Sequence, residues 1–487
     1  MNVLFVSAEV DPFAKVGGLA DVIGSLPIAL RKHDIDARII MPYYGMLDSA
    51  KYNFQWVGGF EFPRRHETVY VEIFSTVHQG VTIYFLKGHP FFGQENSVYV
   101  NYDWDISRFI FFCEAVMQAV EFIDQKASWF PEVIHVNDWH TGLIPFFIAQ
   151  RRGIDARWAH IGSIVGIHNI AYQGQSVGSW LYDLGIPTRH HPELLQRGLG
   201  DNMLAISIAY SDIVTTVSPR YATEIQYPYA GYGLDDLIRS RVDDLYGILN
   251  GIDTDLWNPA TDPKVKVHFD AETFEEKRVA NKLQLQQDVG LQPRADVPLI
   301  GMVTRLVWQK GIDLALPALR VLLASEDVQF IGLGSGEEAY NYGLGQLGND
   351  FNWKARSYIG YNAAVAQQIY ASCDIFLMPS HYEPCGVGQM LAMRYGALPL
   401  VRETGGLADT VQNFDNNTGD HGTGFVFQWE DWEAVLGTLR WATHTYRSNR
   451  EAWMKMQKRA MLTDFSWKRS ALAYIELYEK VQARHQD

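Results

Sequence analysis

The sequence predicts an α/β protein with two doubly wound domains of similar size. In both halves of the chain, short apolar segments typical of buried strands alternate with amphipathic helical segments. A stretch rich in turn-forming residues, LNGIDTDLWNP at residues 249–259, separates the two series and is typical of a domain hinge. With 487 residues, the chain is long enough for several domains, each with its own core.

Eight strands are expected in the first half of the chain, with helices between many of them. These strands are residues 2–8, 37–41, 69–74, 81–86, 133–136, 162–167, 213–217 and 246–249. The opening residues, MNVLFVSAEV, lack the basic start and the cleavage site of a signal peptide, so they are interpreted as the first strand. A glycine-rich loop at residues 11–18 (DPFAKVGG) leads into the first helix, residues 19–32.

The second half of the chain repeats this alternation and ends in helices. Its expected strands are residues 299–304, 328–333, 357–360, 375–378, 398–401 and 424–427, and its last three helices are residues 432–444, 450–462 and 467–481. Within this half, residues 380–406 are expected to form a loop, a helix that opens at Cys385 and Gly386, a strand, and a turn at Gly405 and Gly406. Ligands of doubly wound sheets bind at the C-terminal ends of the strands, so two such domains on one hinge imply a cleft between two strand-end faces.

Composition narrows the class of partner. There are 41 lysines and arginines against 56 aspartates and glutamates, a net charge of −15, which argues against a nucleic-acid partner. The longest apolar helix, residues 106–123, is interrupted by Arg108, Glu114 and Glu121, so a packed helix is expected and not a membrane span. There are only three cysteines, a small and odd number that argues against a disulfide framework. This indicates a reducing compartment, and we expect the cytoplasm.

The first strand-to-helix loop carries Lys15, Gly17 and Gly18. Glycines let backbone amides approach a phosphate, and the lysine adds positive charge; a tight turn with a solvated lysine is the alternative. The loop is not the GxGxxG of a dinucleotide site, and the second strand has no acidic residue in the usual place for ribose binding. Both observations argue against a dehydrogenase.

Two later strand ends carry polar residues that are expected on the same face. In HVNDWH, Asp138 follows a strand and is suited to contact a sugar hydroxyl or to act as an acid or base, although it is also placed to cap the helix from Trp139. A metal site of Asp138 with His135 and His140 is disfavoured, because the spacing fits no standard zinc pattern. His168 ends the next strand, where a lone histidine is usually structural but here shares the predicted face with Asp138.

The second domain carries a corresponding set. Arg305 and Lys310 flank the loop after residues 299–304, and two cations over one loop suit a diphosphate, with a solvated basic loop as the alternative. Glu383 precedes a helix N-terminus, where free amides bind anions, so this carboxylate is expected to face a sugar and not the phosphate; pairing with Arg402 is the alternative. Cys385 is not expected to be a nucleophile, because no histidine is obviously placed to activate it.

With these motifs in place, the chain resembles the bacterial glycogen synthase and plant starch synthase family, the ADP-glucose-dependent retaining glucosyltransferases of family 5 with the GT-B fold. The resemblance covers nearly the whole chain in order and spacing. The motifs are SAEVDPFAKVGGLADV, VNDWHTGL, GIHNIAYQG, TTVSPRYATEI, LNGIDTDLWNP, TRLVWQKGIDL, PSHYEPCGVGQ, VRETGGLADTV and DFSWKRSALAYIELY. The chain departs from many family members at Val16 and at Gly388, where a threonine is common; at Gly388 one hydroxyl contact to phosphate is lost while the backbone N–H remains.

The resemblance implies two Rossmann-like domains facing across a cleft: an acceptor-side domain at 1–252, a nucleotide-sugar domain at 253–465, and a C-terminal helix at 466–487 that crosses back to the first domain. It implies ADP-glucose contacts at Lys15, Gly18, Asn250, Arg305, Lys310, Tyr361, Glu383, Cys385, Val387 and Gly388. The implied catalytic set is Lys15, Asp138, His168, Arg305, Lys310 and Glu383. No metal or cofactor is expected.

The activity that the resemblance implies is transfer of glucose from ADP-glucose to the non-reducing 4-OH of an α-1,4-glucan or maltooligosaccharide, with retention of configuration. Two alternatives remain open: a related GT-B enzyme that uses UDP-glucose, and a non-catalytic glucan-binding protein. The second alternative gives no reason for Arg305, Lys310 and Glu383 to occur together.

Overall fold

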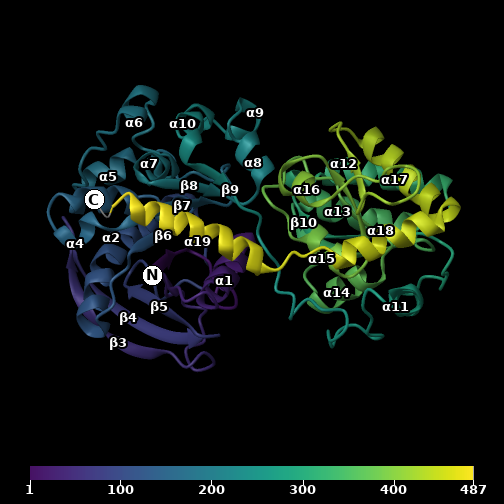
Figure 1. Ribbon diagram of the computed structural model, residues 1–487, viewed down its shortest axis with the longest axis horizontal. Coiled ribbons are helices and arrows are strands. Elements are labelled where there is room, and N and C mark those ends of the chain that lie inside the picture. The colour runs from purple at the N-terminus through teal and green to yellow at the C-terminus, as the bar shows by residue number, and fades with distance from the viewer. Residues whose placement is uncertain (486–487) are drawn as a thin grey trace. The chain divides into compact units, whose positions relative to one another are not determined.

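The computed structural model describes residues 1–485. These divide into two compact units (Figure 1). Unit 1 holds Met1–Gly251 together with the C-terminal segment from Trp467, and unit 2 is Ile252–Ser466. Each unit is an α/β structure, as the alternating pattern of the sequence predicts.

Within the described residues, unit 1 is built on a nine-stranded sheet in the order β3-β4-β5-β2-β1-β6-β7-β8-β9. The strands are β1 (Asn2–Val6), β2 (Asp36–Pro42), β3 (Gln55–Pro63), β4 (Thr68–His78), β5 (Val81–Gly88), β6 (Val133–Asn137), β7 (Gly162–Ile167), β8 (Ile213–Thr216) and β9 (Leu245–Gly247). All neighbouring strands pair in parallel except β4, which is antiparallel to both β3 and β5. All eight predicted strands are confirmed, and β3 is an additional strand.

The additional strand β3 lies at the edge of the sheet, and its buried and exposed side chains do not alternate regularly. Its sequence, QWVGGFEFP, contains two glycines, and most of its side chains are exposed or half-buried. Glycine is disfavoured in strands and weakens the period-2 signal, so local pattern alone gives little indication of this strand.

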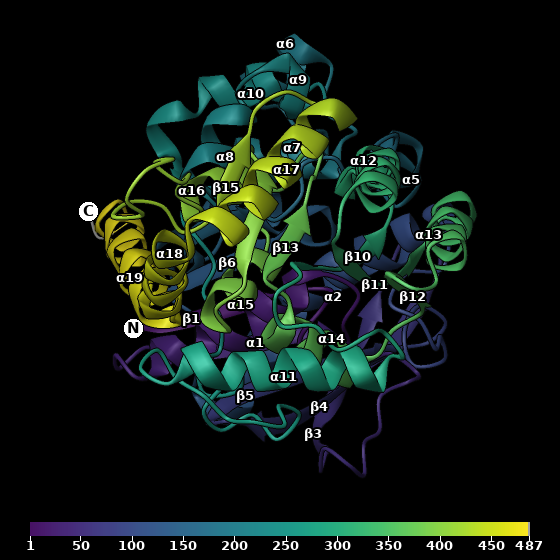
Figure 2. The ribbon, with the colours of Figure 1, turned by 90° about the vertical axis from the view of Figure 1, so that its right-hand side faces the viewer.

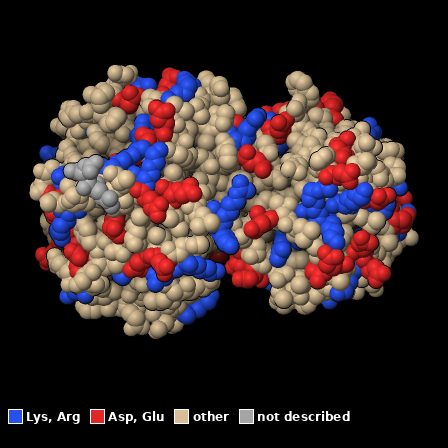
Figure 3. All heavy atoms as spheres, viewed as in Figure 1, with Lys and Arg blue, Asp and Glu red and all other residues tan. Residues whose placement is uncertain are grey.

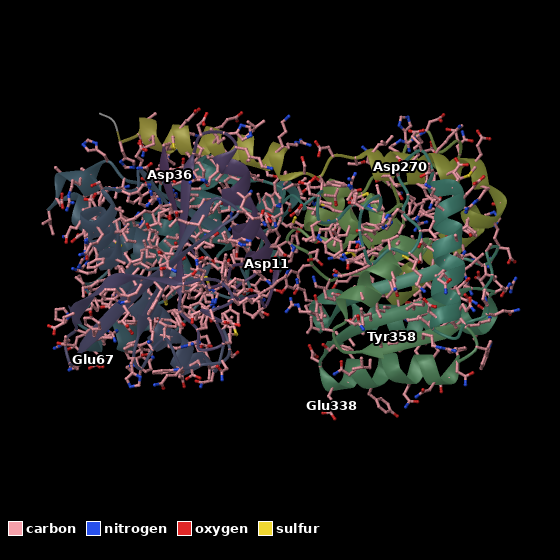
Figure 4. The ribbon with its side chains drawn as sticks, turned by 90° about the horizontal axis from the view of Figure 1, so that it is seen from below. Asp11, Asp36, Glu67, Asp270, Glu338 and Tyr358 are labelled. Atoms are coloured by element: carbon pink, nitrogen blue, oxygen red, sulfur yellow. The ribbon has the colours of Figure 1, made fainter. Side chains whose placement is uncertain are left out.

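Helices of unit 1 connect and cover the strands. They are α1 (Gly18–Arg31), α2 (Tyr102–Ala127), the 3-10 turn η1 (Trp139–Thr141), α3 (Ile144–Arg152), α4 (Ala156–Ala159), α5 (Gly178–Asp183), α6 (Pro192–Arg197), α7 (Met203–Tyr210), α8 (Pro219–Glu224), α9 (Pro228–Gly231), α10 (Asp235–Ser240) and η2 (Val242–Asp244). Because β1 and β2 are parallel, their N-terminal ends lie at one edge of the sheet and their C-terminal ends at the opposite edge. In Figure 4, Asp36 marks the N-terminal end of β2 and Asp11 lies in the loop beyond the C-terminal end of β1.

The C-terminal helix α19 (Trp467–Ala483) packs on unit 1, where Figure 1 shows it lying along the α1 and β6 side. The Tyr478 hydroxyl lies 3.0 Å from Nδ1 of His135 on β6. Ser470 Oγ donates a 2.5 Å hydrogen bond to the carbonyl of Leu249. The last helix of the chain is therefore part of the N-terminal fold.

Unit 2 contains, within the described residues, a six-stranded parallel sheet in the order β12-β11-β10-β13-β14-β15. The strands are β10 (Leu299–Leu306), β11 (Gln329–Gly336), β12 (Ala355–Ile359), β13 (Ile375–Met378), β14 (Leu398–Arg402) and β15 (Phe425–Phe427). All six were predicted from apolar runs bounded by turn formers. Such runs are typical of parallel strands buried on both faces.

Helices cover both faces of this sheet. They are α11 (Phe274–Asp288), the 3-10 turn η3 (Trp308–Lys310), α12 (Ile312–Ser325), α13 (Glu338–Asp350), α14 (Ala363–Ser372), α15 (Gly388–Arg394), α16 (Gly405–Thr410), α17 (Trp432–Ser448) and α18 (Arg450–Leu462). Figure 2 shows α11 and α14 below the strands and α12 and α17 above them. Apolar side chains of the strands and of α12, α13, α15, α16, α17 and α18 form a hydrophobic core.

The turn predicted at Gly405 and Gly406 is wrong, because these glycines begin helix α16. A Cβ at Gly405 would lie 1.9 Å from the carbonyl oxygen of Glu383, and one at Gly406 would lie 2.0 Å from that of Cys385. The glycines therefore serve close packing of α16 against the loop that carries Glu383. Two adjacent glycines resemble a turn signal in the sequence, but the close approach that requires them here is a tertiary contact.

Candidate active site

The loop after β1 is held by a carboxylate that the sequence pattern did not single out. Glu9 is buried, and its Oε2 accepts hydrogen bonds from the backbone N–H groups of Val16 at 2.7 Å and Gly17 at 2.8 Å. Its Oε1 accepts a 2.6 Å hydrogen bond from the Tyr99 hydroxyl. Two amides of the predicted anion-binding loop are thus bonded to an internal carboxylate. The signal that could have identified Glu9 is an acidic residue directly beyond a buried strand.

The same loop places Lys15 and Gly18 at the start of α1. The Lys15 side chain is exposed and its ammonium forms an ion pair with Asp21, so both the phosphate-binding role and the solvated-lysine alternative stay open. Gly17 is the N-cap and Gly18 the first residue of the helix. Among the described residues, nothing lies within 4 Å of a Cβ built at either glycine, so packing does not require glycine here. The loop instead presents bare backbone at the strand-end face.

Asp138 directly follows β6 and is buried. Its Oδ1 accepts a hydrogen bond from the backbone N–H of His168 at 2.7 Å and a longer contact from that of Asn169 at 3.4 Å. The N-cap hypothesis is wrong in its chemistry: Asp138 precedes η1, but within the described chain its side chain makes no capping bond there. Its φ of +53° is rare for a residue with a side chain, and this strained backbone turns the carboxylate toward β7.

Burial raises the pKa of the Asp138 carboxyl to about 7. The two backbone N–H groups lower this pKa and the nearby Glu9 charge raises it, but desolvation is the largest cause. Asp138 therefore changes its protonation state near neutral pH, which suits a group that exchanges protons or interacts with a developing positive charge.

His168, at the end of β7, lies beside Asp138 as predicted for neighbouring strand ends. Its Nε2 is 2.9 Å from Oδ1 of Asn137, which acts as the acceptor if Nε2 carries the proton. Burial lowers the pKa of His168 to about 4, so the ring is neutral at pH 7. Burial likewise lowers the pKa values of His135 and His140 to about 3. His135 is occupied by Tyr478 of α19, a packing role.

Asn250 lies beyond β9 at the end of unit 1's main segment. It is buried, and its Oδ1 has no hydrogen-bond partner among the described residues. A buried acceptor without a donor is uncommon in folded proteins, and a hydroxylated ligand can supply the missing donor.

In unit 2, Arg305 and Lys310 occupy the end of β10 and the turn η3, but their surroundings differ. The exposed Arg305 guanidinium makes no ion pair or hydrogen bond within residues 1–485. Lys310 donates to both carboxylate oxygens of Glu383, at 2.8 and 2.6 Å. One cation of the predicted pair is therefore already neutralised by an internal carboxylate.

Glu383 is buried, and Ser380 Oγ donates to its Oε2 at 3.1 Å. The alternative pairing with Arg402 is wrong. Arg402 Nε donates to the carbonyl of Ser380 at 2.9 Å, and a terminal nitrogen donates to that of His381. Arg402 holds the backbone of the loop, while Lys310, 73 residues away in sequence, holds its carboxylate.

The helix that follows this loop begins later than the pattern predicted, at Gly388 and not at Cys385 and Gly386. Val387 is the N-cap of α15 and Gly388 its first residue, and Gly386 has a φ of +72°. The first amides of a helix have no intrahelical acceptor. A Cβ at Gly388 would lie 3.2 Å from Met378 Sδ, so a larger residue here requires the neighbour to shift. Cys385 is buried just before this turn.

Tyr361 is 90% exposed in the segment between β12 and α14. The adjacent Asn362 caps α14 through hydrogen bonds from the amides of Ala364 and Val365, which fixes the backbone beside the ring. A large exposed aromatic face on an anchored segment is suited to stacking.

Acidic and basic side chains are interspersed on the face shown in Figure 3. Among the described residues, no helix combines the length and the apolar character that crossing a membrane requires.

Comparison with known proteins agrees with this geometry. Residues 2–240 match the starch synthase catalytic domain family, and residues 286–460 match the glycosyl transferases group 1 family. A glycogen synthase of Clostridioides difficile (strain 630) is 41% identical over 487 residues, covering 99% of this chain and 100% of the relative. A glycogen synthase of Streptococcus gordonii is 42% identical over 493 residues, with the same coverage.

Among solved structures, the catalytic domain of starch synthase IV from Arabidopsis thaliana, bound to ADP and acarbose, aligns with a TM-score of 0.89 and 33% identity over 99% of both chains. Two α/β units with mostly parallel sheets, together with these matches, identify a glycosyltransferase of the GT-B fold class. The chain belongs to the glycogen synthase and starch synthase family. It is a glucosyltransferase of glycogen or starch synthesis, and the resemblance and fold class expected from the sequence are confirmed.

Proposed function

We propose that the enzyme transfers glucose from ADP-glucose to the non-reducing 4-OH of an α-1,4-glucan or maltooligosaccharide, with retention at the anomeric carbon. The observation that carries the proposal is the ion pair of the half-buried Lys310 with the buried Glu383, together with the exposed, uncompensated Arg305 near the end of β10. That arrangement offers positive charge for a diphosphate and a carboxylate for the sugar next to it. The starch synthase IV catalytic domain with a TM-score of 0.89 was solved with ADP and acarbose, which supports this donor and acceptor class.

Unit 2 supplies the nucleotide side of the proposed site, corresponding to residues 253–465. Arg305, Lys310 and the amides of Val387 and Gly388 bind the diphosphate, where negative charge grows as the glycosidic bond breaks. Tyr361 stacks on the adenine. Cys385 lines the pocket between them as a small buried group and not as a nucleophile. Glu383 orients the donor glucose.

Unit 1 supplies the remaining groups, in the segment 1–252. Lys15 and Gly18 contact the diphosphate, and Asn250 accepts a hydrogen bond from a sugar or ribose hydroxyl. Asp138 and His168 lie beside the transferred glucose, where the neutral imidazole donates or accepts a hydrogen bond without adding positive charge. The helical segment 466–487 completes this domain; residues 486–487 of it lie outside the described residues.

The proposed chemistry is a front-face attack of the acceptor hydroxyl, guided by the leaving phosphate. The acceptor O4 forms a bond to C1 as the bond from C1 to the ADP oxygen breaks, and the acceptor proton passes to the leaving phosphate oxygen. Detection of a glucosyl ester on a carboxylate such as Glu383 would contradict this route. We place the reaction in the cytoplasm, the reducing compartment that three sparse cysteines indicate.

The test is incubation of the enzyme with maltooligosaccharide and radiolabelled ADP-glucose or UDP-glucose. We expect chain elongation with ADP-glucose. Elongation with UDP-glucose alone would support the related GT-B alternative, and no elongation with either donor would leave a glucan-binding role. The matched variants are Lys310→Ala, expected to lower kcat about 10²–10³-fold, and Lys458→Ala on the surface of α18, expected to have no effect.

A further inference from the structure

The turn that carries Lys310 and the loop that carries Glu383 are joined by a histidine that the sequence analysis did not single out. The His381 ring is 7% exposed and stacks on Trp308 of η3, with ring centroids 4.2 Å apart and an interplanar angle of 10°. The backbone N–H of His381 donates to the carbonyl of Gln309 at 2.9 Å. His381 therefore contacts the two residues that precede Lys310 in the turn.

Both nitrogens of the His381 ring face carboxylates from other elements. Nε2 lies 2.8 Å from Oδ1 of Asp313 in the first turn of α12, and Nδ1 lies 2.5 Å from Oε1 of Glu430, just before α17. A carboxylate oxygen thus lies within hydrogen-bond distance of each ring nitrogen. Arg402 lies 3.7 Å from the second oxygen of Glu430. These contacts at its two nitrogens hold the ring in its plane.

The same two segments meet again on either side of this histidine. Gln309 Nε2 donates a 3.4 Å hydrogen bond to the carbonyl of Tyr382. Gly311, with a φ of +66°, approaches the carbonyl oxygen of Pro379 so closely that a Cβ would lie 2.0 Å away. The relative position of η3 and residues 379–383 is thus set by tight contacts centred on His381.

We propose that His381 is a positioning residue for glucosyl transfer: it holds the Lys310 ammonium and the Glu383 carboxylate in register by locking the turn η3 to the loop 380–383. The inference rests on the proposed function, because it gives Lys310 and Glu383 their roles. His381 itself acts only through them. The separation of the two groups follows the separation of their backbones, and misplacement by about 1 Å is enough to lower turnover about a hundredfold.

The first test uses His381→Phe, which keeps a ring against Trp308 but removes both hydrogen bonds to carboxylates. We expect kcat with ADP-glucose and maltooligosaccharide to fall about tenfold to a hundredfold while KM for the acceptor changes little. His381→Gln, which restores one side-chain donor, is expected to recover part of this loss. His444→Phe, the same replacement at an exposed site on α17, is the control and is expected to leave kcat unchanged.

A double-mutant cycle with Lys310→Ala separates positioning from general loss of structure. If His381 acts through Lys310, the His381→Phe replacement lowers the residual kcat of Lys310→Ala by less than about twofold. An undiminished tenfold or larger effect in that background would overturn the proposal.

The second test does not depend on activity. Hydrogen–deuterium exchange of peptides covering residues 307–311 and 380–384 is expected to quicken in both segments in His381→Phe and in neither segment in His444→Phe. Unchanged exchange in either segment would overturn the positioning role. If the wild-type enzyme elongated no glucan with any donor, the proposed function would fail, while the exchange measurement would still decide whether His381 joins the two segments.

Discussion

Asp138 allows a direct test of how burial changes the pKa of a proposed active-site carboxyl. Its pKa is raised from an ordinary 3.8 to about 7, chiefly because the side chain is buried. In the folded protein the carboxyl holds its proton up to near neutral pH, whereas in the unfolded chain it releases the proton near pH 4. Between these values the unfolded state binds fewer protons, so the free energy of unfolding falls as pH rises.

The magnitude follows from the difference between the two pKa values. At about 1.36 kcal/mol per pKa unit, ionising Asp138 in the folded state lowers the free energy of unfolding by about 4 kcal/mol once the pH is above 7. Below about pH 4 the carboxyl is protonated in both states and makes no such contribution. Asp138→Asn removes the ionisation and keeps an oxygen that accepts from the His168 amide, so it should remove this pH dependence.

We therefore expect Asp138→Asn to match the wild type in stability near pH 4 and to exceed it progressively by up to about 4 kcal/mol at pH 8. The measurement is urea unfolding from pH 4 to 8, followed by hydrogen exchange in peptides of unit 1, because a chain of two units need not unfold in one step. The control is Asp34→Asn, an exposed position with a φ of 60°, which asparagine also adopts readily.

Parallel pH profiles for wild type and Asp138→Asn would refute this reasoning, since they would mean that the folded and unfolded carboxyls titrate together. A profile that diverges in the opposite direction, with the wild type gaining stability as pH rises, would mean that the amides of His168 and Asn169 outweigh desolvation.

Other predictions concern unit 2. Lys282→Met removes the ammonium that contacts Asp374 Oδ2 at 2.7 Å and leaves a buried carboxylate unpaired, so unit 2 should lose about 3–5 kcal/mol of unfolding free energy in urea titrations. Gly437→Ala lies inside α17 with nothing within 4 Å of the added Cβ among the described residues, and should stabilise unit 2 by about 0.5–1 kcal/mol. Gly311→Ala should instead lower the free energy of unfolding of unit 2 by more than about 1 kcal/mol, and with it the thermal midpoint. The reason is that the φ of Gly311 is positive and the new Cβ meets the Pro379 carbonyl. Equal thermal midpoints for Gly437→Ala and Gly311→Ala would contradict these two predictions.

Local pattern was enough to predict most secondary structure and the strand ends at which polar residues gather. The strands β6 and β13, for example, are short apolar runs whose burial requires no distant information beyond the alternation with helices. Because parallel strands bring their C-terminal ends to one edge, Asp138 and His168 were correctly expected to be neighbours. Only the family motifs point to Tyr361, whose exposed ring has no pattern of its own, and its role stays a prediction.

The partner of each side chain was decided only by tertiary structure. Asp138 accepts from amides 30 residues further along, instead of capping the helix beside it, because β6 and β7 are adjacent in the sheet. Glu383 pairs with Lys310 and not with Arg402, which is nearer in sequence, because η3 lies against the loop 380–383. Charges reveal their sign in a sequence but not their distances, and pairing depends on distances that only packing sets. The sequence by itself determined which groups are available at the strand ends, and the fold determined which of them meet.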